Sequence, residues 1–315
     1  MGQEAVRRVS SCSFAHCRAL SLRLEMLQVA RLAPKLLGES AELVRHFLQS
    51  QQNEDGGFQD RSGKSDLYYT VFGLDGLLAL QAEVPRTRIA TYLKSFGDGE
   101  GLDFVHLCCL ARAWAAVSTA GLKHAELPSA VILRRLEAFR ARDGGFHYTR
   151  GCESGSAYAA FLAVGAYQDL KADLHDSMRL VQSLKFLETN DGAWANERSV
   201  KIGSTNATAA AITTLRNLNV PVNQSAGDWL LARSHPDGGF LAAPGAPIPD
   251  LLSTATALHA LAGLQVAFDG VKEKCLDFID TLWTNEGAFH GQWADDDVDC
   301  EYTYYGLLAL GHLSL

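Results

Sequence analysis

Several features that would mark other classes of protein are missing from these 315 residues. No run of 18 or more apolar residues occurs, so we expect no transmembrane helix. The N-terminus also lacks the long apolar core of a signal peptide. Lys and Arg number 28 against 36 Asp and Glu, and the net charge is −8 with no basic cluster. This charge argues against nucleic acid as a partner, because phosphate binding needs a basic face.

The cysteines do not form a recognisable framework. There are seven of them, an odd number, and none is part of a CxxC pair. Several fall within segments that we expect to be helical. A reduced, cytoplasmic setting is therefore the expected environment. The cysteines stand at positions 12, 17, 108, 109, 152, 275 and 300.

What the sequence does have is an internal repeat. Five turns share the pattern acidic, Gly, small, aromatic, and the intervals between them are 88, 48, 46 and 49 residues. The first interval is about twice the others, and a degenerate copy, Asp98-Gly99-Glu100-Gly101, lies near its middle. Six units of this length predict an array of helical pairs. The turns begin at Asp55, Asp143, Asp191, Asp237 and Glu286.

Each unit is expected to hold an outer and an inner helix. The segments 41–48, 128–139, 175–187 and 271–282 space apolar residues three and four apart, which is typical of half-exposed helices. The segments after the turns are rich in small and apolar residues and carry Asp or Ser at their starts, which predicts buried, capped helices. They run over 66–80, 103–117, 154–167, 204–218, 250–264 and 299–313.

This alternation predicts an all-α fold, an α6-α6 barrel of six helical hairpins around a central cavity. If the inner helices run parallel, their N-termini and all six turns gather at one rim, where a site is expected. Residues 1–25 lie outside the repeat and are expected to form a loosely held extension. Residues 26–315 are expected to form a single domain.

The turns and the small-residue helices that follow them resemble the prenyltransferase and squalene-oxidase repeat. Over roughly residues 40–315 the arrangement is similar to the β subunit of protein prenyltransferases, and related barrels occur in triterpene cyclases. The resemblance implies that the cavity binds an isoprenoid or a prenyl diphosphate. It also implies a separate helical α subunit as a partner.

The metal sites of such relatives are not expected here. The family's zinc-ligand positions fall on Asp250, Leu252 and Tyr302, of which only the first is a typical ligand. The run Asp295-Asp296-Asp297-Val298-Asp299 spells DDxxD, a magnesium-diphosphate pattern, but we interpret it as a loop that ends in a helix cap. We therefore expect no cofactor, with zinc and magnesium as the alternatives.

Candidate site residues follow from the expected rim. If the chain is an enzyme, we expect Asp250 or Asp299 to take part in catalysis. The positions where relatives place diphosphate-binding Arg and Lys hold Pro244, Ala246, Pro247 and Pro249, so basic residues on other rim loops would have to replace them. The candidate substrate-binding residues are Tyr68, Tyr69, Tyr158, Tyr302 and Tyr305 for a polyprenyl chain, and Arg198 and Lys201 for a diphosphate.

Three functions remain open at this point. The first is a prenyltransferase-like protein that binds an isoprenoid and transfers a prenyl group without the usual zinc site. The second is a non-catalytic isoprenoid-binding or scaffold protein. The third is a single-domain terpene cyclase, although the sequence lacks a complete Asp-x-Asp-Asp acid motif.

Overall fold

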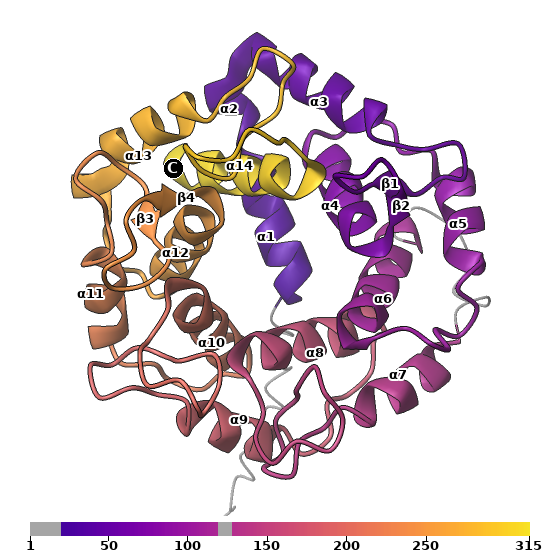
Figure 1. Cartoon of the computed structure of the whole chain (residues 1–315), viewed down its shortest axis with the longest axis vertical. Helices are drawn as coiled ribbons and strands as arrows, with labels where there is room; N and C mark the ends of the chain where they lie inside the picture. Colours follow the sequence, from indigo (N-terminus) through magenta and orange to yellow (C-terminus); the bar gives the residue numbers. More distant parts are fainter. Residues whose placement is uncertain (1–19, 119–127) are drawn as a thin grey trace, which may run out of the picture.

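The protein is a closed ring of paired helices. The computed structural model describes residues 20–118 and 128–315, and in these ranges six inner helices alternate with six outer helices (Figure 1). The predicted α6-α6 barrel is confirmed. The inner helices are α4 (Leu67–Ala79), α6 (Phe104–Ser118), α8 (Ala157–Asp169), α10 (Thr205–Asn217), α12 (Leu251–Gly263) and α14 (Cys300–Leu313). The outer helices are α3 (Ala41–Ser50), α5 (Arg86–Lys94), α7 (Ser129–Glu137), α9 (Ser177–Lys185), α11 (Ser225–Leu231) and α13 (Asp269–Thr281).

Each inner helix packs against the next, and α14 packs against α4, so the ring closes. The inner helices run parallel, because residues at the N-termini of neighbouring helices meet each other and residues in their C-terminal halves do the same. Tyr68, the second residue of α4, contacts Glu301, the second residue of α14, and His259 in α12 contacts His312 near the end of α14. The six inner N-termini therefore lie at one rim, together with the glycine turns.

The turns are fixed to the inner helices by a repeated hydrogen bond. In three of the six units, the backbone amide of the turn aromatic donates to the hydroxyl of a Thr at the fourth position of the following inner helix. Phe58 donates to Thr70 at 2.9 Å, and Phe240 donates to Thr254 at the same distance. Both aromatic side chains are fully buried. In two units the turn also pairs with the residues before the helix as a short hairpin, β1 (Phe58–Gln59) with β2 (Ser65–Asp66) and β3 (Phe240–Leu241) with β4 (Pro249–Asp250).

The last turn closes the ring onto the first outer helix. Gly287 has a positive φ of +88°, and a Cβ atom built there would lie 2.3 Å from the carbonyl carbon of Leu43 in α3. Only glycine fits this approach, because it tolerates the left-handed conformation and has no side chain. The turn of the sixth unit thus packs on the first unit as the other turns pack on their neighbours.

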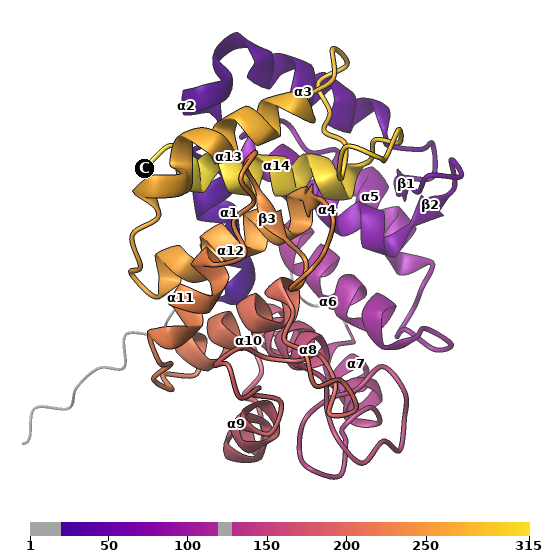
Figure 2. The ribbon, with the colours of Figure 1, turned by 60° about the vertical axis from the view of Figure 1, so that its left-hand side comes forward.

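A further helix, α1 (Leu22–Ala30), lies inside the ring (Figure 1), and a turned view shows it behind α12 and α14 (Figure 2). It contacts α4, α8, α10 and α14. Its polar contacts are with residues near the C-terminal ends of the inner helices, so α1 closes the end of the barrel opposite the turns. The expected boundary between residues 25 and 26 falls within this helix, and residues 1–19 lie outside the described ranges. The short helices α2 (Pro34–Leu37) and η1 (Gly38–Ser40) connect α1 to α3.

Candidate functional site

A cavity occupies the centre of the ring, and three positions of the inner helices line it. The second residue of all six helices faces the cavity, as does the sixth residue of all six. The ninth residue does so in every inner helix except α4. This spacing places the three positions on one face of each helix. The second-position ring consists of Tyr68, Val105, Tyr158, Asn206, Leu252 and Glu301.

The cavity has two lobes, with about 630 and about 550 Å³ of unfilled space when the solvent that opens into them is included. The first lobe lies among α1, α4, α6 and α8, and the second lies among α10, α12 and α14. The residues that line both lobes are Met26, Tyr68, Tyr158, Phe161 and Tyr305.

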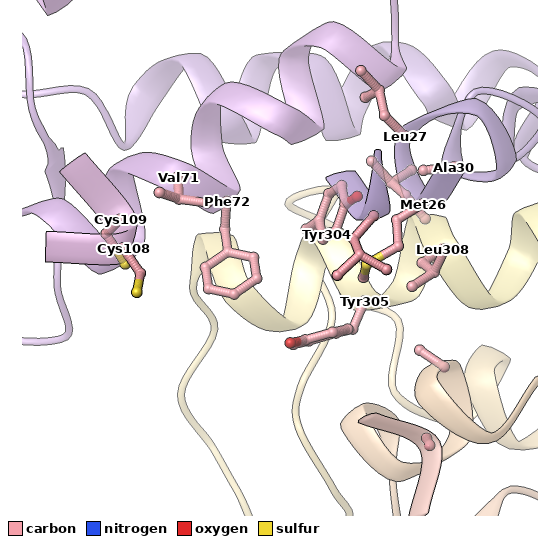
Figure 3. Close-up of a cluster of buried hydrophobic side chains, with 14 of the residues drawn as sticks. Met26, Leu27, Ala30, Val71, Phe72, Cys108, Cys109, Tyr304, Tyr305 and Leu308 are labelled. Atoms are coloured by element: carbon pink, nitrogen blue, oxygen red, sulfur yellow. The ribbon is translucent and has the colours of Figure 1, made fainter. Parts of the chain in front are cut away.

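Aromatic rings form much of the wall between the lobes. Phe72 lies 4.9 Å from Tyr68 and 5.5 Å from Tyr305 between ring centroids, and the rings of Tyr158 and Phe161 stack at 6.3 Å. Figure 3 shows Phe72 of α4 and Tyr305 of α14 on neighbouring walls of the cavity. Such a surface suits an apolar ligand and can also stabilise positive charge over the ring faces.

A carboxyl group lies in the apolar wall of the second lobe. Glu301 lines the second lobe, and the hydroxyl of Tyr68 donates a hydrogen bond of 2.5 Å to its Oε1. Burial, reinforced by the nearby charge of Asp299, raises the pKa of Glu301 to about 7. Burial also raises the pKa of Tyr68, so its phenol keeps its proton. At neutral pH the Glu301 carboxyl is thus divided between its protonated and its charged form, which is the condition for proton transfer.

Charged groups also lie at the floor of the first lobe, where they pair with one another. Arg112 lines this lobe and binds Asp75 through Nη2 and Nε at 2.8 and 3.0 Å, while Arg23 of α1 binds the other oxygen of Asp75 at 2.9 Å. Asp169 lies 3.6 Å from Arg23, and burial raises its pKa to about 6. This floor therefore offers no unpaired cation to an anionic ligand.

The sequence profile of the prenyltransferase alpha-alpha toroid domain matches residues 23–96 and 206–314, more than half of the chain. This chain belongs to the prenyltransferase toroid family. A comparison with curated protein sequences finds no match.

Solved structures of the same fold include cyclases and a transferase. A variant of the type II terpene cyclase MstE from Scytonema, in complex with merosterolic acid A, is 15% identical with a TM-score of 0.59, over 93% of this chain and 98% of that one. Protein geranylgeranyltransferase-I from Candida albicans, complexed with GGPP, is 17% identical with a TM-score of 0.50, over 92% of this chain and 82% of that one. A protein from Actinoplanes is 16% identical with a TM-score of 0.60, over 87% of this chain and 98% of that one.

The structure places the two predicted catalytic aspartates at the ends of helices. Asp250 caps α12, where its two oxygens accept hydrogen bonds of 2.7 Å from the amide and the hydroxyl of Ser253. Burial raises its pKa. Asp299 caps α14 by accepting from the Tyr302 amide at 2.9 Å, and its second oxygen binds Arg61 at 2.8 Å. Both carboxylates are held by protein groups, and neither is among the residues that line the two lobes.

The family's zinc-ligand positions do not fit a metal. Leu252 is aliphatic and lines the second lobe, and the oxygens of Asp250 are already bound. Among residues 20–118 and 128–315, no three His, Cys, Asp or Glu side chains are grouped so that they could hold an ion. In the DDxxD run, Arg61 binds Asp295 and Asp299 and lies 3.6 Å from Asp297. The carboxylates of Asp295, Asp297 and Asp299 are therefore paired with Arg61 at the rim.

The other candidate residues divide into two groups. Tyr68, Tyr158 and Tyr305 come together on the cavity wall. Tyr69 and Tyr302, the third residues of their helices, are not among the residues that line the two lobes, and the Arg61 guanidinium lies 5.5 Å from the Tyr302 ring centroid.

Arg198 and Lys201 lie away from the cavity, in the loop that follows the turn beginning at Asp191. The Arg198 guanidinium lies 5.5 Å from the Phe186 ring centroid, and Lys201 Nζ donates to the Arg198 carbonyl. Both line a separate surface hollow beside α9. The structure therefore does not bring these two basic residues together with the cavity tyrosines.

Glu301 was missed by the sequence interpretation, although a signal for it exists. The acidic run before α14 drew attention to Asp299, whereas Glu301 stands two residues later. In the repeat it is equivalent to Tyr68 and Tyr158, which were predicted to face the cavity. Aligning the second residues of the inner helices would have placed Glu301 beside them.

Proposed function

We propose that this protein binds an isoprenoid in its central cavity, with a headgroup other than a diphosphate. The observation that carries the proposal is the two-lobed cavity, whose shared wall consists of four aromatic rings and Met26. A polyprenyl chain would bury apolar area against every inner helix. Burial of apolar surface is the main favourable contribution to binding such a ligand.

The charges around the cavity support an uncharged headgroup. Arg23 and Arg112, which line the first lobe, are both bound to Asp75, and Arg61 at the rim is bound to Asp295 and Asp299. A diphosphate would have to break these pairs and leave buried carboxylates without partners, which is costly. We therefore expect a prenyl alcohol to bind more tightly than the corresponding diphosphate.

A matched pair of glycine variants tests binding in the cavity. Gly165 lines the first lobe, and a Cβ atom there would meet nothing within 4 Å. Gly270 in the outer helix α13 has equally open surroundings. In calorimetric titrations with geranylgeraniol, Gly165→Leu should weaken binding about tenfold or more because it fills the lobe, whereas Gly270→Leu should bind like the unaltered protein. Equal affinity of both variants, or no binding by the unaltered protein, would contradict the proposal and favour a scaffold role.

A second candidate function is cyclisation started by protonation, and Glu301 is the observation that favours it. Its carboxyl lies in the aromatic cavity with a pKa of about 7, raised chiefly by burial. Transfer of its proton to a terminal double bond would leave a carbocation on the isoprenoid. Further double bonds would attack that cation and form ring bonds, and loss of a proton would end the reaction. The rings of Tyr68, Tyr158 and Tyr305 could stabilise the cationic intermediates.

Product analysis decides between binding and cyclisation. The unaltered protein is incubated with geranylgeraniol, and the extract is analysed by gas chromatography with mass detection. Cyclisation predicts an isomeric cyclic product that disappears in Glu301→Gln, while that variant still binds the alcohol. A cyclic product that persists in Glu301→Gln would exclude Glu301 as the acid, and unchanged substrate would leave binding as the function.

An α-subunit-like helical partner is a separate proposal that rests on the family resemblance. The chain's own helix α1 packs against α4, α8, α10 and α14 and closes one end of the barrel. We expect the purified chain to bind an isoprenoid without a partner. Binding that appears only after a cell extract is added would instead support an obligatory partner.

A further inference from the structure

Helix α1 forms the floor of the cavity and is held there by polar contacts at both sides. Arg23 binds Asp75 of α4 at 2.9 Å, and Glu25 binds Arg216 of α10 at 2.8 Å. The first amide of the helix, that of Leu22, donates to Gln168 of α8 at 2.9 Å. Three inner helices that are distant in sequence therefore fix the position of α1.

Met26 is the α1 side chain that reaches the junction of the two lobes. It lines both lobes, whereas Leu27, the next residue, lines neither. Both are buried, with 6% and 3% of their surfaces exposed. Figure 3 shows Met26 beside Tyr305, with Leu27 on the side of α1 away from that ring. A chain that enters from the rim between Tyr68 and Tyr305 meets Met26 at the bottom.

We propose that Met26 determines the length of isoprenoid that the cavity accepts, an inference that rests on the proposed function. The floor cannot move away from a longer chain without breaking the contacts of Arg23 and Glu25. In a close-packed interior, extra methylene groups that meet a fixed wall force side chains out of their preferred rotamers. A chain that ends above Met26 buries more apolar area with each added isoprene unit, so its affinity rises. A longer chain meets Met26, so its affinity falls.

The test compares Met26→Ala with Leu27→Ala as a matched control on the same helix. Calorimetric titrations use a series of prenyl alcohols in which each member is one isoprene unit longer than the last. For the unaltered protein we expect affinity to rise with length to an optimum and then to fall. Met26→Ala should move this optimum to a longer alcohol and raise affinity for the first over-long member about tenfold. Leu27→Ala should keep the original optimum.

Met26→Phe provides the opposite change if the alanine variant folds poorly. Its larger ring should raise the floor and move the optimum to a shorter alcohol, and thermal unfolding shows that each variant is folded. Unchanged optima in Met26→Ala and Met26→Phe, with clear binding by the unaltered protein, would overturn this inference alone. No binding of any alcohol by the unaltered protein would overturn the proposed function and this inference together.

Discussion

At the residue scale, the starts of the inner helices explain why acidic residues recur at the rim. The residue before each inner helix is Asp or Ser, and each one accepts a backbone N–H from the first turn of its helix. Such caps satisfy amides that have no partner within the helix. The capping residues are Asp66, Asp103, Ser156, Ser204, Asp250 and Asp299.

Substitution of Asp250 separates a capping role from a catalytic one. We expect Asp250→Ala to lower the free energy of unfolding by about 1 kcal/mol, because the first turn of α12 loses its cap. Asp250→Ser should retain most of this stability, since serine also caps helices well. Urea denaturation measures both. If Asp250→Ser unfolds normally but no longer binds or converts an isoprenoid, the carboxylate acts on the ligand.

Glu301 predicts a pH dependence of ligand binding. Its pKa is raised to about 7, chiefly by burial, so below this pH the carboxyl is neutral and matches an apolar ligand. As the pH rises through 7 the group becomes charged, and a bound isoprenoid would remove water from that charge. Affinity for geranylgeraniol should therefore fall above pH 7 in the unaltered protein.

Glu301→Gln supplies the control for this titration, because an amide of similar shape does not ionise. We expect its affinity for geranylgeraniol to stay constant between pH 6 and pH 8. A fall in affinity of the same size in Glu301→Gln would show that another group is responsible.

At the scale of elements, His106 connects two neighbouring inner helices. Its Nε2 lies 3.2 Å from Asp66 at the start of α4, and its Nδ1 lies 2.9 Å from Asp103 at the start of α6. The hydrogen bond with Asp66, supported by the one with Asp103, raises the pKa of His106 to about 9. The charged imidazolium thus holds two helix caps together.

This pair of contacts predicts a loss of stability at alkaline pH. Because the pKa of His106 is raised, the contribution is complete below pH 6.5, the ordinary pKa of histidine, and is lost as the pH rises through 9. We expect the free energy of unfolding to fall by about 1 kcal/mol. The value is small because His106 is partly exposed and solvent screens its charge. Urea denaturation at pH 6 and pH 9.5 should show this difference in the unaltered protein and a smaller one in His106→Gln. Equal differences in both proteins would disprove the assignment.

The sequence allowed most elements to be predicted because each repeats. The apolar spacing of α3, α7, α9 and α13 and the small residues of the inner helices are local signals. The first was found in four units and the second in all six. Helix α1 has no such signal. Its contacts depend on Arg23 and Glu25, whose partners Asp75 and Arg216 lie 52 and 191 residues away. No local pattern indicates pairs of this kind, so its place in the barrel became visible only in the folded chain.

At the scale of the whole molecule, closure of the ring depends on the contact between the last turn and the first outer helix. Gly287→Ala would place a methyl group 2.3 Å from the Leu43 carbonyl carbon and would require a positive φ of an alanine. We expect a loss of more than about 2 kcal/mol in unfolding free energy. The matched control is Gly270→Ala, which should be neutral or stabilising by about 0.5–1 kcal/mol. A similar stability of the two variants would contradict this role for the turn.

The cavity could be predicted from the sequence only in part, because ring closure decides which faces point inward. The repeat predicted the barrel and three of its lining tyrosines, Tyr68, Tyr158 and Tyr305. Assignment of Arg198 and Lys201 relied on their proximity to a turn, but the turn directs that loop to the outside. Neighbouring tyrosines behave as helix geometry requires, since Tyr305 lines the cavity and Tyr304 packs in the layer behind it.

The most direct test of the account is to locate a bound isoprenoid on the chain. A geranylgeraniol analogue that carries a photoreactive diazirine at its hydrocarbon end is bound to the purified protein and irradiated, and the labelled peptides are identified by mass spectrometry. We predict labels on α1 and on the inner helices around Met26, Phe161 and Tyr305, and competition by unlabelled geranylgeraniol. Labels confined to the outer surface, such as the loop of Arg198 and Lys201, would contradict the claim that the cavity is the binding site.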